Sequence, residues 1–174
     1  MIVGTAAAER LDASTLISLL QFEEPIHFVV NVPRESYIAG DAIALSERKS
    51  VPVGSLGDLM RAVSLPDVRK YVDKETEFIT RGLRQHTRIS DYHRSADRAY
   101  EISRHELPKI SVVFLNEYEM TADHVRTARD RYGPFRLLVI TNPNGRATTS
   151  AEGVAGSLGI EIHRWRSFLG RLNR

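Results

Sequence analysis

The sequence contains no cysteine, and this absence excludes several kinds of site at once. A chain without cysteine forms no disulfide framework, no thiolate zinc centre and no cysteine nucleophile. It also lacks the glycine and lysine spacing of a phosphate-binding P-loop, a His-x-x-x-His pair and a Gly-x-Ser-x-Gly elbow. The sequence therefore carries no complete catalytic signature.

Long apolar runs and an excess of one charge are also missing. The longest apolar runs are too short to span a bilayer, and residues 1–5 lack the basic start and long apolar core of a signal peptide. We therefore expect a cytoplasmic protein that does not enter a membrane. The net charge of +2 permits contacts with nucleic-acid or nucleotide phosphates without requiring them.

Six short runs rich in Val, Ile, Leu and Phe are the predicted strands. They are nearly continuous rather than alternating, which is typical of strands buried on both faces in a parallel sheet. Between them lie helical patterns whose first turns are preceded by residues suited to capping, namely Asp12 or Ser14, Thr121 and Ser150. The predicted strands are residues 1–3, 26–32, 51–53, 110–115, 135–141 and 160–162.

This alternation predicts an α/β fold in a single domain of 174 residues, with a mainly parallel sheet of about five to six strands covered by helices. Residues 1–64 form a first βα unit and residues 110–174 a second. An overlay of residues 1–64 on 110–173 needs no gap and aligns five identical pairs, including Pro25 with Pro134 and Val30 with Val139. Duplication and shared periodicity both remain explanations of this likeness.

The intervening segment, residues 65–109, has a different pattern and is predicted to be a two-helix insertion. Pro66 suits the start of this insertion and Pro108 its end. Apolar residues at helical spacing mark the two expected helices: Val68, Tyr71, Val72, Phe78, Ile79 and Leu83 in the first, and Tyr92, Ala96, Ala99, Tyr100 and Leu107 in the second.

The loop after the fifth predicted strand offers the chemistry of a phosphate site. Its amides, hydroxyls, flexible glycine and one cation precede a helix, and helix N-termini attract anions. The candidate residues are Asn142, Asn144, Gly145, Arg146, Thr148, Thr149 and Ser150, and Arg34 joins them if the two halves share one sheet. The alternative is a turn followed by a helix cap.

A second pattern is Gly40-Asp41 followed by Glu47-Arg48-Lys49-Ser50. It resembles the corresponding segment of XPF-type nucleases in the restriction-endonuclease-like PD-(D/E)xK superfamily, and residues 137–172 resemble the closing half of Mrr-type members. The resemblance implies that Asp41 and Glu47 hold Mg²⁺ and that Lys49 stabilises the attacked phosphate. A hairpin over residues 35–49 favours this nuclease, whereas a helix there leaves the strand-end loops of a Rossmann-like fold as the site.

Three functions follow as alternatives. The first is a nucleic-acid-associated domain, either an active nuclease or a catalytically silent relative. The second is a receptor for a nucleotide or another phosphate, and the third is an interaction module that forms a homodimer or belongs to a larger assembly. One-signed charge gathers only near the C-terminus, at Arg164, Arg166, Arg171 and Arg174.

Overall fold

The computed structural model describes residues 1–33 and 36–174. The chain divides into two compact units, Met1–Phe78 and Ile79–Arg174, called unit 1 and unit 2 below. Their boundary lies inside the segment predicted as an insertion, within helix α4 (Lys74–Gln85). Each unit has its own sheet and its own core.

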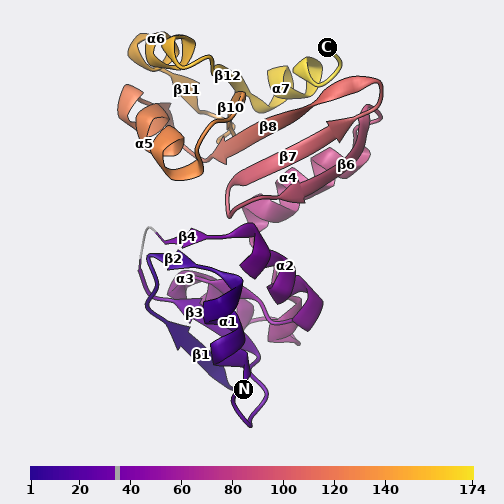
Figure 1. Cartoon of the computed structure of the whole chain (residues 1–174), viewed down its shortest axis with the longest axis vertical. Coiled ribbons are helices and arrows are strands. Elements are labelled where there is room, and N and C mark those ends of the chain that lie inside the picture. Colours follow the sequence, from indigo (N-terminus) through magenta and orange to yellow (C-terminus); the bar gives the residue numbers. More distant parts are fainter. Residues whose placement is uncertain (34–35) are drawn as a thin grey trace. The chain divides into compact units, whose positions relative to one another are not determined.

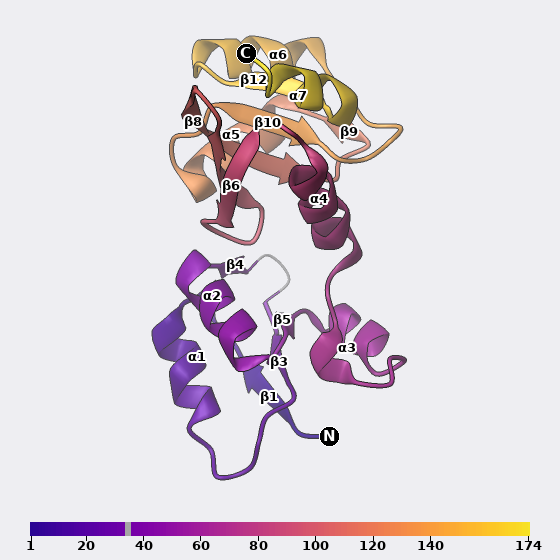
Figure 2. The same ribbon diagram turned by 90° about the vertical axis from the view of Figure 1, so that its right-hand side faces the viewer.

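Unit 1 contains a three-stranded parallel sheet in the order β1-β3-β5, at β1 (Val3–Ala6), β3 (Phe28–Asn31) and β5 (Val53–Gly54). Two helices lie on one side of the sheet and a third on the other (Figure 2). These are α1 (Ala13–Leu20), α2 (Gly40–Lys49) and α3 (Leu56–Ala62), and a short ladder joins β2 (Arg10–Leu11) to β4 (Tyr37–Ile38). A 3-10 turn, η1 (Val68–Lys70), packs through Val68 on the α3 side.

Unit 2 contains a five-stranded sheet in the order β12-β10-β8-β7-β6 (Figure 1). The first three strands run parallel, whereas β7 and β6 are antiparallel additions to the edge. The strands are β6 (Ile89–Arg94), β7 (Ala99–Arg104), β8 (Leu107–Leu115), β10 (Leu137–Ile140) and β12 (Glu161–Arg164). The helices are α4, α5 (Ala122–Tyr132), α6 (Thr149–Ser157) and α7 (Trp165–Arg171), and β9 (Glu119–Met120) pairs with β11 (Arg146–Ala147).

The hydrophobic core of unit 2 lies on the side of the sheet that carries α4 and α7, and it contains more residues than the equivalent core of unit 1. Ile79 and Leu83 of α4 pack there with Phe168 and Leu172 near the C-terminus, over strand residues such as Val112. The corresponding core of unit 1 consists of Phe28, Val30, Ala62 and Val68. Burial of apolar surface from water is the main force that holds each unit together.

The six apolar runs are confirmed as strands, because each contains or overlaps a strand of the two sheets. Two of the predicted helix starts are confirmed by capping bonds, from Thr15 N to Asp12 Oδ1 at 2.9 Å and from His124 N to Thr121 Oγ1 at 3.4 Å. At the third start, Thr148 rather than Ser150 is the cap, and it accepts from Ala151 N at 3.2 Å. The α/β class of the sequence prediction is thereby confirmed.

Two finer predictions are wrong. The expected single, mainly parallel sheet is replaced by the parallel sheet of unit 1 and the mixed sheet of unit 2. The expected second helix of the insertion is the β6–β7 hairpin, so that residues 65–109 supply η1, α4 and two strands. Tyr100 and Ile102 are buried on one face of β7 and Glu101 and Ser103 are more exposed, which is the alternation of a strand.

The two βα halves have the same order of strands and helices and the same strand registers. A constant shift of 109 residues carries the pair Val3–Phe28 onto Val112–Leu137, and the pair Val29–Val53 onto Leu138–Ile162. It carries the small ladder of Arg10 with Tyr37 onto that of Glu119 with Arg146. The same shift takes the first residues of α1, α2 and α3 onto those of α5, α6 and α7.

Loop conformation follows the same shift. Ser50 ends α2 with a φ of 52°, and its counterpart Gly159, just after α6, has a φ of 69°. The left-handed region is accessible to glycine at little cost, so unit 2 carries the residue that the conformation favours. Equal strand registers, together with equal connections from each of the first two parallel strands to the helix that follows, identify the two halves as versions of one architecture.

Candidate functional site

The residues of the nuclease resemblance lie on a helix. Asp41 is in the first turn of α2, and Glu47 and Lys49 are in its last turns, with all three side chains exposed. Six helical residues at about 100° each turn Asp41 and Glu47 roughly 120° apart around the helix. The Asp41 carboxylate accepts a hydrogen bond from Ala42 N at 2.7 Å. The structure does not bring the two carboxylates together, so the Mg²⁺ site remains an expectation from the resemblance alone.

The loop from Asn142 to Ser150 uses much of its polarity internally. Asn142 Oδ1 accepts from Asn144 N at 3.0 Å, and its backbone oxygen accepts from Gly145 N at 3.0 Å. Thr148 Oγ1 caps α6 and lies 3.0 Å from Ser150 Oγ. Gly145 is buried, and a Cβ at this position would collide with the backbone oxygen of Glu117. These contacts favour the structural alternative of a turn and a cap.

Arg146, the cation that the loop itself contributes, is paired with a neighbouring carboxylate. Arg146 is largely exposed and pairs with Glu119 at 3.4 Å. Thr149 is exposed at the start of α6. Arg34 lies outside the described residues, and β3 and β10, the strands that precede the two loops, belong to different sheets. A phosphate site at this loop stays a prediction.

A different part of unit 2 concentrates positive charge in a hollow of about 800 Å³, called the basic pocket below. It lies where β8, β10 and β12 begin and where β7 ends, so its side chains come from several elements. Five of the lining residues are cations and one is a carboxylate. The lining consists of Arg104, Pro108, Lys109, Ile110, Arg136, Glu161, His163, Arg171 and Arg174.

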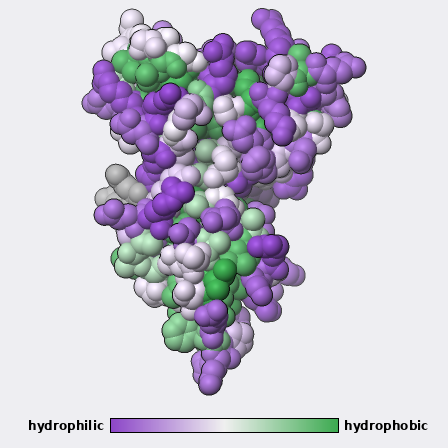
Figure 3. Space-filling model, viewed as in Figure 1, coloured by the Kyte–Doolittle hydropathy of each residue, from purple (hydrophilic) through white to green (hydrophobic). Residues whose placement is uncertain are grey.

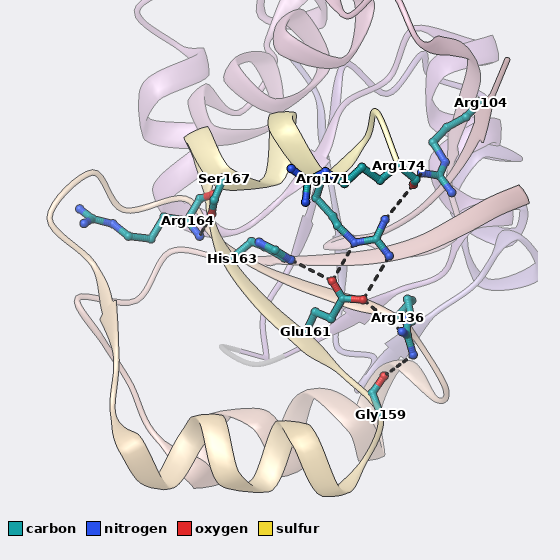
Figure 4. Close-up of polar contacts among 9 residues, drawn as sticks. All are labelled: Arg104, Arg136, Gly159, Glu161, His163, Arg164, Ser167, Arg171 and Arg174. Carbon is teal, nitrogen blue, oxygen red and sulfur yellow. Dashed lines mark hydrogen bonds and ion pairs between the residues drawn. The ribbon is translucent and has the colours of Figure 1, made fainter. Parts of the chain in front are cut away.

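Glu161 organises the cations of the basic pocket, as Figure 4 shows. Its carboxylate accepts two hydrogen bonds from Arg171, from Nε at 2.8 Å and from Nη2 at 3.1 Å. Arg136 Nη2 lies 3.1 Å from the same carboxylate, and His163 Nε2 lies 3.2 Å from it. Two-pronged pairing of this kind holds a guanidinium in a fixed orientation.

Backbone oxygens accept further hydrogen bonds from three guanidinium groups, those of Arg104, Arg136 and Arg171. Arg104 donates to Pro108 O from Nη2 at 2.8 Å and also to Arg174 O. Arg171 Nη1 donates to Arg174 O at 2.8 Å, and Arg136 Nη1 donates to Gly159 O at 3.1 Å. Pro108 O and Gly159 O are amide oxygens, which position Arg104 and Arg136 without cancelling their charge.

The electrostatics agree with this geometry. The hydrogen bonds from Arg171 lower the pKa of Glu161 to about 2, so the carboxylate is charged at neutral pH. Burial and the nearby Arg171 lower the pKa of Arg104, which is the effect of placing like charges close together. One carboxylate side chain among five cationic side chains leaves an excess of positive side-chain charge, and an anion entering the pocket relieves the repulsion.

Unit 1 shows that the fold does not require these charges. At the positions shifted by 109 residues, His27 replaces Arg136, Pro52 replaces Glu161 and Ala62 replaces Arg171. The strand pairs nevertheless form in the same registers and α3 spans the residues equivalent to α7, although β5 is shorter than β12. The shared arrangement of strands and helices therefore forms in unit 1 without these charges at the equivalent positions.

The sequence indicated only part of this pocket. Arg171 and Arg174 belong to the one-signed C-terminal segment, whereas Arg104, Lys109 and Arg136 are scattered along the chain and meet only through the sheet. Of the other C-terminal cations, Arg164 turns to the loop described above, where it donates to Pro143 O at 2.9 Å. The lone tryptophan, Trp165, packs against the core of unit 2.

Histidines take structural roles in the described residues. His86 Nε2 lies 3.0 Å from Leu169 O, and His124 Nδ1 accepts from Thr121 N at 3.2 Å. Among residues 1–33 and 36–174 no three His, Asp or Glu side chains gather as a metal site would require. In the same ranges no helix combines the length and the apolarity needed to cross a membrane. Comparisons with models of protein families, with curated proteins and with solved structures give no significant match.

Proposed function

We propose that this protein binds nucleic acid, and that the basic pocket of unit 2 contacts the phosphate backbone. The observation that carries this proposal is that five cations line one hollow together with a single acidic side chain, Glu161. At three of these positions unit 1 carries His27, Pro52 and Ala62 instead. An excess of positive side chains in one hollow attracts anions. Guanidinium and ammonium groups are the usual partners of phosphate.

The lining favours a phosphodiester backbone over a free nucleotide. Only Pro108 and Ile110 are apolar among the lining residues. His163 is the one aromatic side chain of the lining, and its Nε2 lies 3.2 Å from the Glu161 carboxylate. Proteins that read bases or hold nucleotides place aromatic faces or shaped apolar walls against the ring. A pocket of cations without such a wall supports contacts that are independent of sequence.

Binding of labelled single-stranded and double-stranded oligonucleotides, measured over a range of salt concentrations, tests the proposal. The logarithm of the binding constant is expected to fall linearly with the logarithm of salt concentration. Lys109→Gln and Arg136→Gln should each weaken binding and reduce the slope by about 0.7–0.9, the value for one lost phosphate contact.

Arg126→Gln is the matched control, because Arg126 is exposed on α5 and pairs with Asp123 at 2.8 Å outside the basic pocket. Equal losses in the control and the pocket variants would refute a specific role of the pocket. Absence of binding at low salt would refute nucleic-acid binding altogether. If a free nucleotide displaces the oligonucleotide at equal phosphate concentration, the pocket serves a small ligand instead.

A further inference from the structure

The outer edge of β1 is an open sheet edge, and its counterpart in unit 2 is covered. In unit 2, β8 pairs with β10 on one side and with β7 on the other. The equivalent strand β1 pairs with β3, and no second partner of β1 exists among the residues that the structure describes. An unpaired edge is a template for an additional strand.

The register identifies which residues of β1 form this edge. Val112 lies opposite Tyr100 of β7, and Phe114 N donates to Arg98 O at 2.9 Å. The 109-residue shift carries Val112 and Phe114 onto Val3 and Thr5. Thr5 is exposed and Val3 is half-buried at the border of the unit 1 core. Their backbone groups are in the place where unit 2 forms its bonds to β7.

A largely apolar hollow of about 520 Å³ accompanies this edge. Its lining includes Ile2, Val3, Leu19 and Phe22, and the Phe22 side chain is 69% exposed. Figure 3 shows green, hydrophobic residues at the surface of this unit, over the part that carries α1. An exposed phenylalanine beside an open sheet edge is a feature of surfaces that other proteins cover.

A second surface of unit 1 is uncovered in the same way. In unit 2, Trp165, Leu169 and Leu172 of the last helix pack with the core to which α4 belongs. Their counterparts on and after α3 are Leu56, Met60 and Val63, which are 64%, 66% and 47% exposed. The segment from α4 to β7 thus covers in unit 2 the two surfaces that unit 1 leaves open.

Charge specifies the incoming strand further. In unit 2, Tyr132 donates to Asp97 at 3.2 Å, just before β7 begins. The shift replaces Tyr132 by Glu23, which lines the hollow beside β1 together with Glu24. Tyr132 ends α5 whereas Glu23 follows the end of α1 at Leu20, so the comparison concerns the charge beside the sheet edge and not an identical side-chain position. Glu23 and Glu24 present carboxylate acceptors in the hollow beside β1, and a complementary strand carries Lys or Arg at the end that lies near them.

We propose that unit 1 binds an extended segment of another protein, which pairs antiparallel with the outer edge of β1 and places a basic residue against Glu23. Alternating apolar residues of that segment cover Val3 as Tyr100 and Ile102 of β7 cover the sheet of unit 2. Backbone hydrogen bonds supply affinity in such strand addition, and the basic and apolar side chains supply selectivity.

A defined probe peptide tests the proposal on the full chain. The peptide Lys-Arg-Ala-Tyr-Glu-Ile-Ser-Arg reproduces residues 97–104 with lysine in place of Asp97, and the control peptide keeps the aspartate. Titration is followed by the amide signals of Val3 and Thr5 in an isotope-labelled protein. The lysine peptide should bind at least about tenfold more tightly than the aspartate peptide, and Glu23→Lys should reverse this preference.

Backbone pairing is tested with Thr5→Pro, which removes an edge N–H and should abolish binding, whereas Thr5→Ala should retain it. If Thr5→Pro does not fold, the Glu23→Lys exchange still tests the proposal through the charge contact. No binding of the lysine peptide at about 1 mM would overturn the proposal. Equal binding of both peptides to every variant would also overturn it, as would self-association of the full chain that Thr5→Pro abolishes, because the occupant would then be a second copy.

Discussion

Gly82 in α4 allows Trp165 of α7 to approach the helix closely. A Cβ built on Gly82 would collide with Trp165 Cζ2 and lie 3.1 Å from Cη2. The indole is rigid and packs against the core of unit 2, so it cannot yield as the end of a flexible chain would. We predict that Gly82→Ala destabilises unit 2.

The magnitude follows from two opposing contributions. Alanine stabilises a helix interior by about 1 kcal/mol relative to glycine, whereas overpacking a filled core costs about 1–3 kcal/mol. The net loss is therefore about 0–2 kcal/mol for Gly82→Ala. Gly153 in α6 is the matched control, because it is exposed, lies inside a helix and has no atom within 4 Å of a built Cβ. Gly153→Ala should gain about 1 kcal/mol.

Urea unfolding followed by tryptophan fluorescence measures both variants. Trp165 is the one tryptophan in the sequence and belongs to unit 2, so its emission reports that unit. The two midpoints should move in opposite directions without a change in slope. In a Trp165→Leu background, followed by circular dichroism, Gly82→Ala should recover the gain of the control. Equal stabilisation by both glycine substitutions in the wild-type background would refute the close approach of α4 and α7.

Two further predictions concern unit 2. The pKa of Glu161 falls from its ordinary value of 4.5 to about 2, chiefly because Arg171 donates hydrogen bonds to it, so its stabilisation is complete above about pH 4.5 and is lost as the pH falls towards about 2. Acid unfolding followed by Trp165 fluorescence should show this pH dependence in the wild type and a smaller one in Glu161→Gln; identical profiles would contradict it. Gly145→Ala should cost about 1–3 kcal/mol in urea unfolding, because its Cβ meets Glu117 O and Ile140 Cγ2, and a neutral result would show that the loop relaxes freely.

Two of the strands that the sequence predicted, β3 and β10, are buried on both faces. Leu137 to Ile140 and Phe28 to Val30 are buried throughout, so every position is apolar and the run is visible without knowledge of its neighbours. The sequence did not predict β6 and β7, in which one face is more exposed than the other. In β6 and β7 the spacing of Tyr92, Ala96, Ala99 and Tyr100 imitates a helix, and the alternation of Tyr100 and Ile102 with polar neighbours was the available signal for a strand.

The basic pocket could not be predicted from the sequence, for a different reason. Arg104 and Arg136 are separated by two strands and a helix, and only the pairing of β7, β8 and β10 brings them to one hollow. The stretch from Asn142 to Ser150 has residues of the right type, but hydrogen bonds that no spacing reveals occupy several of them. The resemblance that includes Asp41 and Glu47 depended on a hairpin, whereas residues 40–49 form helix α2, which buries Ala42 and Leu45.

The constant 109-residue shift also bears on where the chain tolerates insertions. Surface connections usually vary in length between versions of one architecture, yet here five identities in 64 aligned pairs coexist with equal connections from the first two parallel strands of each half to the helices that follow. Matching backbone bonds explain this, because Tyr37 N donates to Glu9 O at 2.8 Å and Arg146 N to Tyr118 O at 3.0 Å. The connection after β10 is thereby part of the scaffold, and an added residue there would displace the start of α6, whereas the exposed turn at His105 and Glu106 carries no such constraint from the repeat.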